Sequence, residues 1–174
     1  GIRRGFGAQT SIDDTLEGFQ HARNTGADVM NNSWGSTAAF GDSFGINFVG
    51  TDYSAVGDEM VNLVNLGRGG LGTSIVFSAG NSRSTGDNVN YKNFQNSPYV
   101  ITVGATDSNG DVTSFSTPGA AILLSAPGQL VRAYNTNGTV SGVSGTSFSG
   151  PIVSGVIALM YDANPNLGYR DVQE

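Results

Sequence analysis

Hydrophobic residues recur at helical spacing in two segments of the chain, residues 11–24 and 53–66. The first segment opens with Ser11, a common residue at a helix amino terminus, and ends before Gly26. The second ends at Gly67, the first residue of a glycine-rich run. The pattern therefore predicts a helix in each segment. The apolar positions on which it rests are Leu16, Phe19, Ala22, Val56, Met60, Leu63 and Val64.

Short, continuous apolar runs alternate with these helices. They begin near Ala27, Thr73, Tyr99 and Ala121. Runs of this kind are typical of strands that are buried on both faces of a parallel sheet. We therefore expect an α/β fold with a mostly parallel sheet, and at 174 residues the chain has the size of one domain.

The segment that starts at Gly150 predicts a third helix. Pro151 would stand in its first turn, where a proline is tolerated because the N–H of that position has no partner within the helix. The small residues Ser154, Gly155 and Ala158 indicate that this helix packs tightly inside the domain.

Two polar segments predict loops. Residues 37–52 follow neither the helical nor the strand period, which indicates a long surface loop. The segment that begins at Asp107 is similar to the first half of a calcium-binding loop, but Pro118 occupies the position of the bidentate glutamate. A hairpin turn at Asn109-Gly110 is the better interpretation.

Composition and charge exclude several classes of function. The net charge is -6, so the chain offers no basic surface for nucleic acid. It contains no cysteine, which excludes disulfides and thiol nucleophiles. No apolar run approaches the roughly 20 residues that cross a bilayer. Neither nucleic acid nor a membrane is an expected partner.

The segment Gly145-Thr-Ser-Phe-Ser-Gly-Pro holds a candidate nucleophile. It places Ser147 at the mouth of a predicted helix, close to unsatisfied backbone N–H groups and the positive end of the helix dipole. A serine hydroxyl in that position is suited to attack on a carbonyl. The alternative interpretation is an ordinary helix cap.

The segment Ser78-Ala-Gly-Asn ends an apolar strand with a turn of small residues. It would present the side-chain amide of Asn81 at the carboxyl edge of the sheet, where α/β proteins bind their ligands. An amide there can donate a hydrogen bond to a developing oxyanion. The alternative is that Gly80-Asn81 only forms a turn.

A third candidate, Asn32-Ser-Trp-Gly, also follows an apolar strand. An extended backbone at this point could pair with a substrate peptide by strand addition. Trp34 could line a specificity pocket, or it could pack into the core.

Taken in this order and spacing, the three segments resemble those of the subtilisin-like serine proteases. The resemblance is greatest to the kexin-like branch and extends from Ser11 to Gln173. It implies that residues 1–174 are the carboxyl-terminal part of one peptidase domain, a subtilisin-like three-layer α/β/α fold with a mostly parallel sheet. The kexin-like segments start at Asn32, Gly67, Gly145 and Asn166.

The resemblance also implies a reaction. Ser147 would form an acyl-enzyme during peptide-bond hydrolysis, and Asn81 together with the Ser147 backbone N–H would hold the oxyanion. Ser33 to Gly35 would align the substrate strand, and Ser78 to Gly80 would form one side of the primary specificity pocket. The substrate-binding residues implied in this way are Ser33, Trp34, Gly35, Ser78, Ala79 and Gly80.

A serine nucleophile needs a general base, and the chain contains one histidine, His21. It falls in the middle of the first predicted helix, in a segment that matches a family helix lying after the catalytic histidine, so we reject it as the base. The family's catalytic aspartate and histidine motifs precede the first residue of this sequence. We therefore expect them on a missing amino-terminal segment, whether a precursor was cut in two, a fragment was expressed, or the segment was lost.

The chain departs from the kexin-like pattern near the primary pocket. That branch uses acidic residues there for calcium and for basic side chains, but Ser36-Thr-Ala-Ala follows Gly35, and Thr117 stands in place of a glutamate. Asp87 is the one matching acid, so preference for dibasic sites and a structural calcium both stay open, and no cofactor is certain. The remaining acids that could favour cations at neighbouring pockets are Asp42, Asp52, Asp58 and Glu59.

The expected partners are a peptide or protein substrate, the missing segment and a propeptide, and family habit implies secretion. Two alternatives remain at this point. One is a catalytically inactive subtilisin-like module that binds peptides along residues 33–35. The other is an α/β scaffold whose small-residue turns are purely structural.

Overall fold

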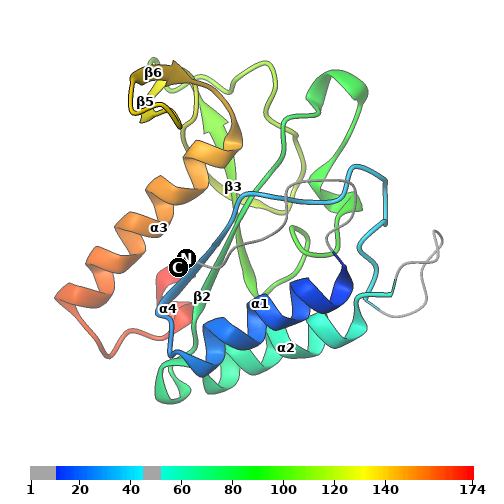
Figure 1. Cartoon of the computed structure of the whole chain (residues 1–174), viewed down its shortest axis with the longest axis vertical. Helices are drawn as coiled ribbons and strands as arrows, with labels where there is room; N and C mark the ends of the chain where they lie inside the picture. Colours follow the sequence, from blue (N-terminus) through cyan, green and yellow to red (C-terminus); the bar gives the residue numbers. More distant parts are fainter. Residues whose placement is uncertain (1–10, 45–51) are drawn as a thin grey trace.

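The computed structural model describes residues 11–44 and 52–174. Its longest elements are three helices that flank a sheet of parallel strands (Figure 1). The helices are α1 (Ile12–Asn24), α2 (Ser54–Leu66), α3 (Thr146–Ala163) and the short α4 (Tyr169–Gln173). Single turns of 3-10 helix are η1 (Gly67–Gly70), η2 (Arg83–Thr85) and η3 (Val89–Tyr91). The strands are β1 (Val29–Asn32), β2 (Ser74–Ser78), β3 (Val100–Thr106), β4 (Ile122–Pro127), β5 (Val131–Tyr134) and β6 (Val140–Val143).

The central sheet has the strand order β1-β2-β3-β4, and every pair in it is parallel. Ile75 in β2 pairs with Met30 in β1 and with Val100 in β3. Helix α2 connects β1 to β2, and helices pack on both faces of the sheet, which confirms the predicted α/β class. The carboxyl ends of the strands therefore meet along one edge.

Strand β2 lies in the middle of the three layers and is buried on both faces. Ile75 and Phe77 point into the cluster beneath α1 and α2, whereas Val76 points into the cluster beneath α3. This alternation follows from the two-residue period of a strand. Figure 1 shows α3 across the sheet from α1 and α2, as the predicted three-layer arrangement requires.

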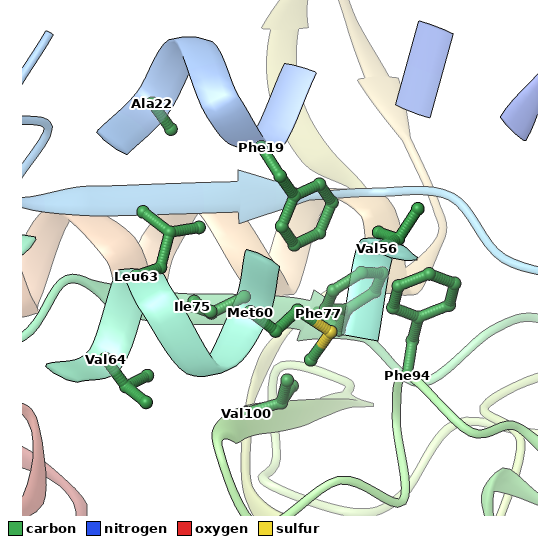
Figure 2. Close-up of a cluster of buried hydrophobic side chains, with 10 residues drawn as sticks. All are labelled: Phe19, Ala22, Val56, Met60, Leu63, Val64, Ile75, Phe77, Phe94 and Val100. Carbon is green, nitrogen blue, oxygen red and sulfur yellow. The ribbon is translucent and has the colours of Figure 1, made fainter. Parts of the chain in front are cut away.

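The core between the sheet and the helices α1 and α2 is rich in aromatic rings (Figure 2). Phe94, from the loop before β3, is fully buried and packs on Phe77 with 5.3 Å between ring centroids. Phe19 of α1 closes the cluster from the other side, 6.1 Å from Phe94. All seven apolar positions behind the first two predicted helices lie in this cluster or pack against it.

The ends of α1 agree with the sequence prediction. The Ser11 hydroxyl accepts a hydrogen bond from the Asp14 N–H at 3.0 Å, and the Asp14 carboxylate accepts one from the Ser11 N–H at 3.1 Å. This reciprocal capping box satisfies two backbone donors at the helix amino terminus. Gly26, just beyond the helix, has φ of 69°, a conformation that favours glycine.

Helix α3 differs from its prediction in two ways. It begins at Thr146, so Pro151 is the sixth helical residue and does not stand in the first turn. The prediction that it packs tightly inside the domain is wrong as well, because Gly155 and Ala158 are exposed on the face away from the sheet. Three apolar side chains share that exposed face, namely Ile152, Val156 and Leu159.

The remaining predictions had mixed outcomes. Asp107 accepts the N–H groups of Asn109 and Asp111, which builds the expected turn, but the segment after it contributes only one isolated bridge, at Val112. The antiparallel hairpin β5–β6 was not predicted. Of the predicted loop at 37–52, residues 45–51 lie outside the described residues. Among the described helices, none has the length and apolar character needed to cross a membrane.

Candidate active site

Ser147 is the second residue of α3 and is half-buried. Gly145 is the cap residue directly before the helix, and its φ of 153° and ψ of 152° carry the chain into the first turn. The backbone N–H groups of a first helical turn have no acceptors within the helix. Ser147 thus combines a nucleophilic hydroxyl with an N–H group that the helix itself leaves unpaired.

Asn81 lies three residues beyond β2, at the carboxyl edge of the sheet, and its side chain is tied to the start of α3. Its Oδ1 accepts hydrogen bonds from the Thr146 N–H at 2.9 Å and from the Thr146 hydroxyl at 3.0 Å. Since the oxygen is held in this way, the amide nitrogen Nδ2 is the end left to donate. A Cβ built on Gly145 would lie 3.4 Å from that nitrogen. The donor therefore lies close to the turn that holds Ser147.

Thr146 connects the two segments and was missed by sequence reasoning. Its side chain is buried, and its hydroxyl donates to Asn81 Oδ1 while accepting the Gly80 N–H at 3.1 Å. The signal that could have identified it is its position directly before Ser147, because a hydroxyl there can bond both to the helix start and to a neighbouring strand end.

Ser147 and Asn81 open onto the same groove, which has a volume of about 240 Å³. Residues 33–37 form one stretch of its lining and residues 78–82 another. All eight residues that the sequence assigned to catalysis or substrate binding line this groove. The fold thus brings together three segments that are far apart in the chain.

The serines of the two strand ends hold the backbone of the first turn. The Ser33 hydroxyl donates to the Ser147 carbonyl at 3.1 Å, and the Ser78 hydroxyl donates to the Thr146 carbonyl at 2.8 Å. The Ser147 carbonyl is available because residue 151, the usual donor four residues on, is a proline without an N–H. These bonds fix the turn that holds Ser147 against the ends of β1 and β2.

Trp34 and Gly35 follow β1 in different environments. The indole of Trp34 packs into the core, edge-on to Phe77 at 4.9 Å and to Phe94 at 5.1 Å. Its ring therefore has the core position that sequence reasoning left as the alternative, although the residue still lines the groove. At Gly35 a Cβ would lie 2.8 Å from Gln95 Nε2, so a larger residue would displace the groove wall.

His21 is exposed on α1 and lines a different cavity of about 460 Å³, which runs along α1 and β1.

Two of the acids proposed to favour cations at neighbouring pockets are buried and already have partners within the chain. Asp42 accepts backbone N–H groups of Asn93 and Phe94, and Glu59 pairs with Arg23. Among the described residues no group of three or more His, Cys, Asp or Glu side chains could hold a metal ion.

Comparisons with known proteins bear on the family and the fold of this chain. The model of the subtilase family matches residues 3–174. The kexin of Saccharomyces cerevisiae is 38% identical over 119 residues, which cover 66% of this chain and 15% of that protein. The kexin of Candida albicans is 33% identical over 178 residues, which cover 99% of this chain and 18% of that protein.

Among solved structures, a cold-adapted subtilisin-like serine proteinase matches with a TM-score of 0.73 and 25% identity. The match covers 95% of this chain and 53% of that structure. The chain therefore spans less than one fifth of the two kexins and about half of the solved proteinase.

Proposed function

Because this chain belongs to the subtilase family, we propose that it carries the nucleophile and an oxyanion donor of a serine endopeptidase. The observation that carries the proposal is the double hydrogen bond from Thr146 to Asn81 Oδ1. It holds the Asn81 amide beside Ser147 with its nitrogen available to donate. A donor fixed in advance near a nucleophile stabilises negative charge without reorganisation during the reaction.

In the proposed reaction, the Ser147 hydroxyl oxygen attacks the carbonyl carbon of a peptide bond, and its proton passes to a general base. The carbonyl oxygen becomes an oxyanion that accepts hydrogen bonds from Asn81 Nδ2 and the Ser147 N–H. Collapse breaks the C–N bond, the amine leaves with the proton, and water later hydrolyses the ester on Ser147. The positive end of the α3 dipole favours the oxyanion further.

The base and its aspartate are proposed to come from an amino-terminal segment of the same domain that is not part of this sequence. Support comes from the free edge of β1, which pairs with β2 alone in the described sheet, and from the cavity beside that edge. The exposed apolar face of α3, with Val156 and Leu159, offers a second surface for such a segment. His21 lines the cavity and not the groove of Ser147, so it is not the proposed base.

The substrate is proposed to be a peptide or protein whose backbone lies along residues 33–35. Residues 78–80 would flank the side chain that precedes the cleaved bond. The family resemblance adds two further proposals, export from the cell and a propeptide as partner. Within the groove, Asp87 is paired with Lys92 and is not free to bind calcium. A structural calcium ion is therefore proposed only outside the groove.

A fluorophosphonate probe on the full-length protein tests the proposal. We expect the probe to label Ser147, and Ser147→Ala to abolish both labelling and peptide hydrolysis. Peptide binding without any labelling would favour the inactive binding module instead. Hydrolysis that persists in Ser147→Ala would overturn the assignment.

The matched variant Asn81→Asp separates the donor from the clamp. Aspartate keeps an oxygen for the two Thr146 hydrogen bonds, and it replaces the amide donor by an acceptor. We expect kcat to fall by about 100-fold or more, the effect of losing one oxyanion donor, while the circular dichroism spectrum and thermal midpoint change little. Unchanged kcat would remove Asn81 from the mechanism.

A further inference from the structure

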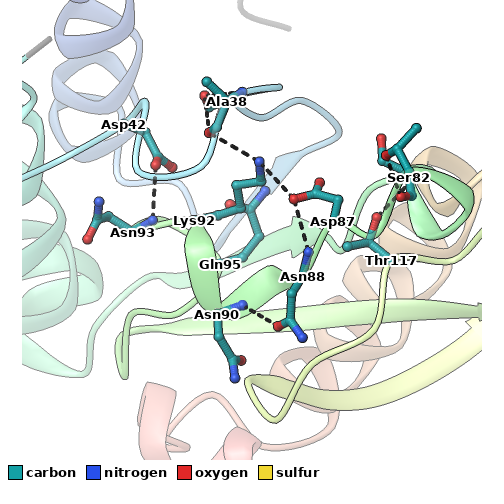
Figure 3. Close-up of polar contacts among 12 residues, drawn as sticks. Ala38, Asp42, Ser82, Asp87, Asn88, Asn90, Lys92, Asn93, Gln95 and Thr117 are labelled. Atoms are coloured by element: carbon teal, nitrogen blue, oxygen red, sulfur yellow. Dashed lines mark hydrogen bonds and ion pairs between the residues drawn. The ribbon is translucent and has the colours of Figure 1, made fainter. Parts of the chain in front are cut away.

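The lining of the groove includes an ion pair between Lys92 and Asp87 (Figure 3). Lys92 Nζ lies 3.1 Å from Asp87 Oδ1 and donates to the Ala38 carbonyl at 3.2 Å. The Lys92 side chain is only 3% exposed and that of Asp87 17% exposed. Neither charge can turn away into solvent without leaving the other buried and unpaired.

This pair determines the charge that the groove presents. Asp87 is the single acidic residue among the described residues that line it, and Lys92 is the single basic one. Because they neutralise one another, a substrate side chain that enters the groove meets no free countercharge. Moving a further charge from water into such a site costs desolvation free energy, and no oppositely charged group is free to offset that cost.

Gln95 adds a polar group to the lining of the same groove. Its Nε2 donates to the carbonyl oxygens of Trp34 and Ser78, at 3.4 and 3.3 Å, which fixes which end of the amide is the donor. Its Oε1 is buried and has no hydrogen-bond partner among the described residues. A buried acceptor without a partner is stabilised by any group that brings a donor to it.

We propose that this groove selects substrates whose residue before the cleaved bond, the P1 residue, is uncharged and donates a hydrogen bond, as glutamine does, and that it rejects lysine and arginine. The inference rests on the proposed function, since it names the substrate class of the same site. Lys92 determines this preference, because it forms an ion pair with Asp87, the acid that would otherwise pair with a basic substrate side chain. The inference decides against the preference for dibasic sites that the sequence left open.

Matched peptides that differ only at P1 test the proposal on the full-length protein. The P1 residues are glutamine, norleucine, lysine and arginine, and kcat/KM is measured for each. We expect kcat/KM for glutamine to exceed that for lysine and arginine by about tenfold or more, a usual size for discrimination within a pocket. Faster cleavage after lysine or arginine in the unmodified protein would overturn the inference.

Two variants connect the preference to the ion pair. Lys92→Met keeps the length of the side chain and frees Asp87, so the ratio of lysine or arginine to norleucine cleavage should rise by about tenfold. The double variant Asp87→Asn with Lys92→Met removes both charges and should show no such rise. The double variant also provides a test if the single variant does not fold, since it leaves no unpaired charge. A rise in the ratio of lysine or arginine to norleucine cleavage in the double variant would refute the role of Asp87.

Fluorophosphonate labelling of Ser147 keeps the two proposals apart, because the probe carries no P1 side chain. Labelling with preferential cleavage after basic residues would defeat only the specificity inference. No labelling of the folded full-length protein would defeat the proposed function and this inference with it.

Discussion

Replacing Thr146 by valine tests whether this residue orients Asn81, the proposed oxyanion donor. Valine has nearly the shape of threonine and lacks the hydroxyl. The change removes the hydrogen bond to Asn81 Oδ1 at 3.0 Å and leaves the half-buried Gly80 N–H without its acceptor at 3.1 Å. The Thr146 backbone N–H still holds Asn81 Oδ1 at 2.9 Å, because every residue except proline keeps that donor.

The magnitude follows from these contacts. A lost hydrogen bond costs about 1 kcal/mol and an orphaned buried donor about 1–3 kcal/mol, so the free energy of unfolding should fall by about 2–4 kcal/mol. Complete loss of an oxyanion donor costs about 3–4 kcal/mol in the transition state. Since one of the two hydrogen bonds to Asn81 Oδ1 survives, we expect kcat to fall by about tenfold, with KM nearly unchanged.

The assay is peptide hydrolysis by the full-length protein, together with urea unfolding. Thr146→Ser is the control, because it retains the hydroxyl and loses only a methyl group, and it should keep most of kcat. The outcome that refutes the reasoning is a valine variant that is destabilised and yet has the kcat of the unmodified protein. In that case the hydroxyl would hold the fold together without orienting Asn81.

Three further predictions concern the scaffold. Phe94→Ala should lower the free energy of unfolding by about 3–5 kcal/mol in urea titrations, because Phe94 is fully buried against the rings of five other aromatic residues; Phe94→Leu should lose clearly less. Ser11→Ala should cost about 1 kcal/mol by removing the cap on the Asp14 N–H, and Ser11→Asp should restore it. Gly80→Ala should lower the free energy of unfolding by about 1–3 kcal/mol and should also lower kcat, since Gly80 has φ of 102° and an added Cβ would lie 3.0 Å from Thr117 Oγ1. An alanine variant with an unaltered urea midpoint would contradict this.

Much of the fold could be predicted because it depends on short-range patterns. The helical period of Phe19 and Ala22, and of Met60 and Leu63, identified the faces that the structure buries. The predicted strands were continuous apolar runs, and the alternation of helices and strands was enough to indicate a parallel sheet. These features are encoded locally, and the tertiary structure does not override them.

Other features depend on contacts that a local pattern cannot show. The hairpin β5–β6 was missed because each strand has four residues and neither contains a buried one, so the apolar pattern of both is weak. The start of α3 was misplaced because Thr146 and Ser147 are neutral residues for a helix. The exposed face around Leu159 was expected to be buried, since a helix that is apolar on all sides gives no sign of which side meets the sheet.

At the candidate site, the residues that the sequence singled out line one groove, but the residues that hold them in place were not predicted. Ser147 and Asn81 belong to segments with a recognisable order and spacing. Thr146, Lys92 and Gln95 each have a hydrogen-bond partner 54 to 66 residues away in the chain, namely the Gly80 N–H, the Ala38 carbonyl and the Trp34 carbonyl, and no periodicity reports such pairs. Their roles became apparent only from the distances in the structure.

Pro151 affects the turn that holds Ser147. A proline at the sixth helical position removes the N–H that would bond the Ser147 carbonyl, a change that ordinarily destabilises a helix. Here that carbonyl accepts the Ser33 hydroxyl from the end of β1 at 3.1 Å. The Ser78 hydroxyl at the end of β2 holds the preceding carbonyl, and Thr146 binds Asn81. The turn that presents Ser147 is thus fixed by the ends of two strands, so the helix defect contributes to the order on which a preorganised oxyanion site depends.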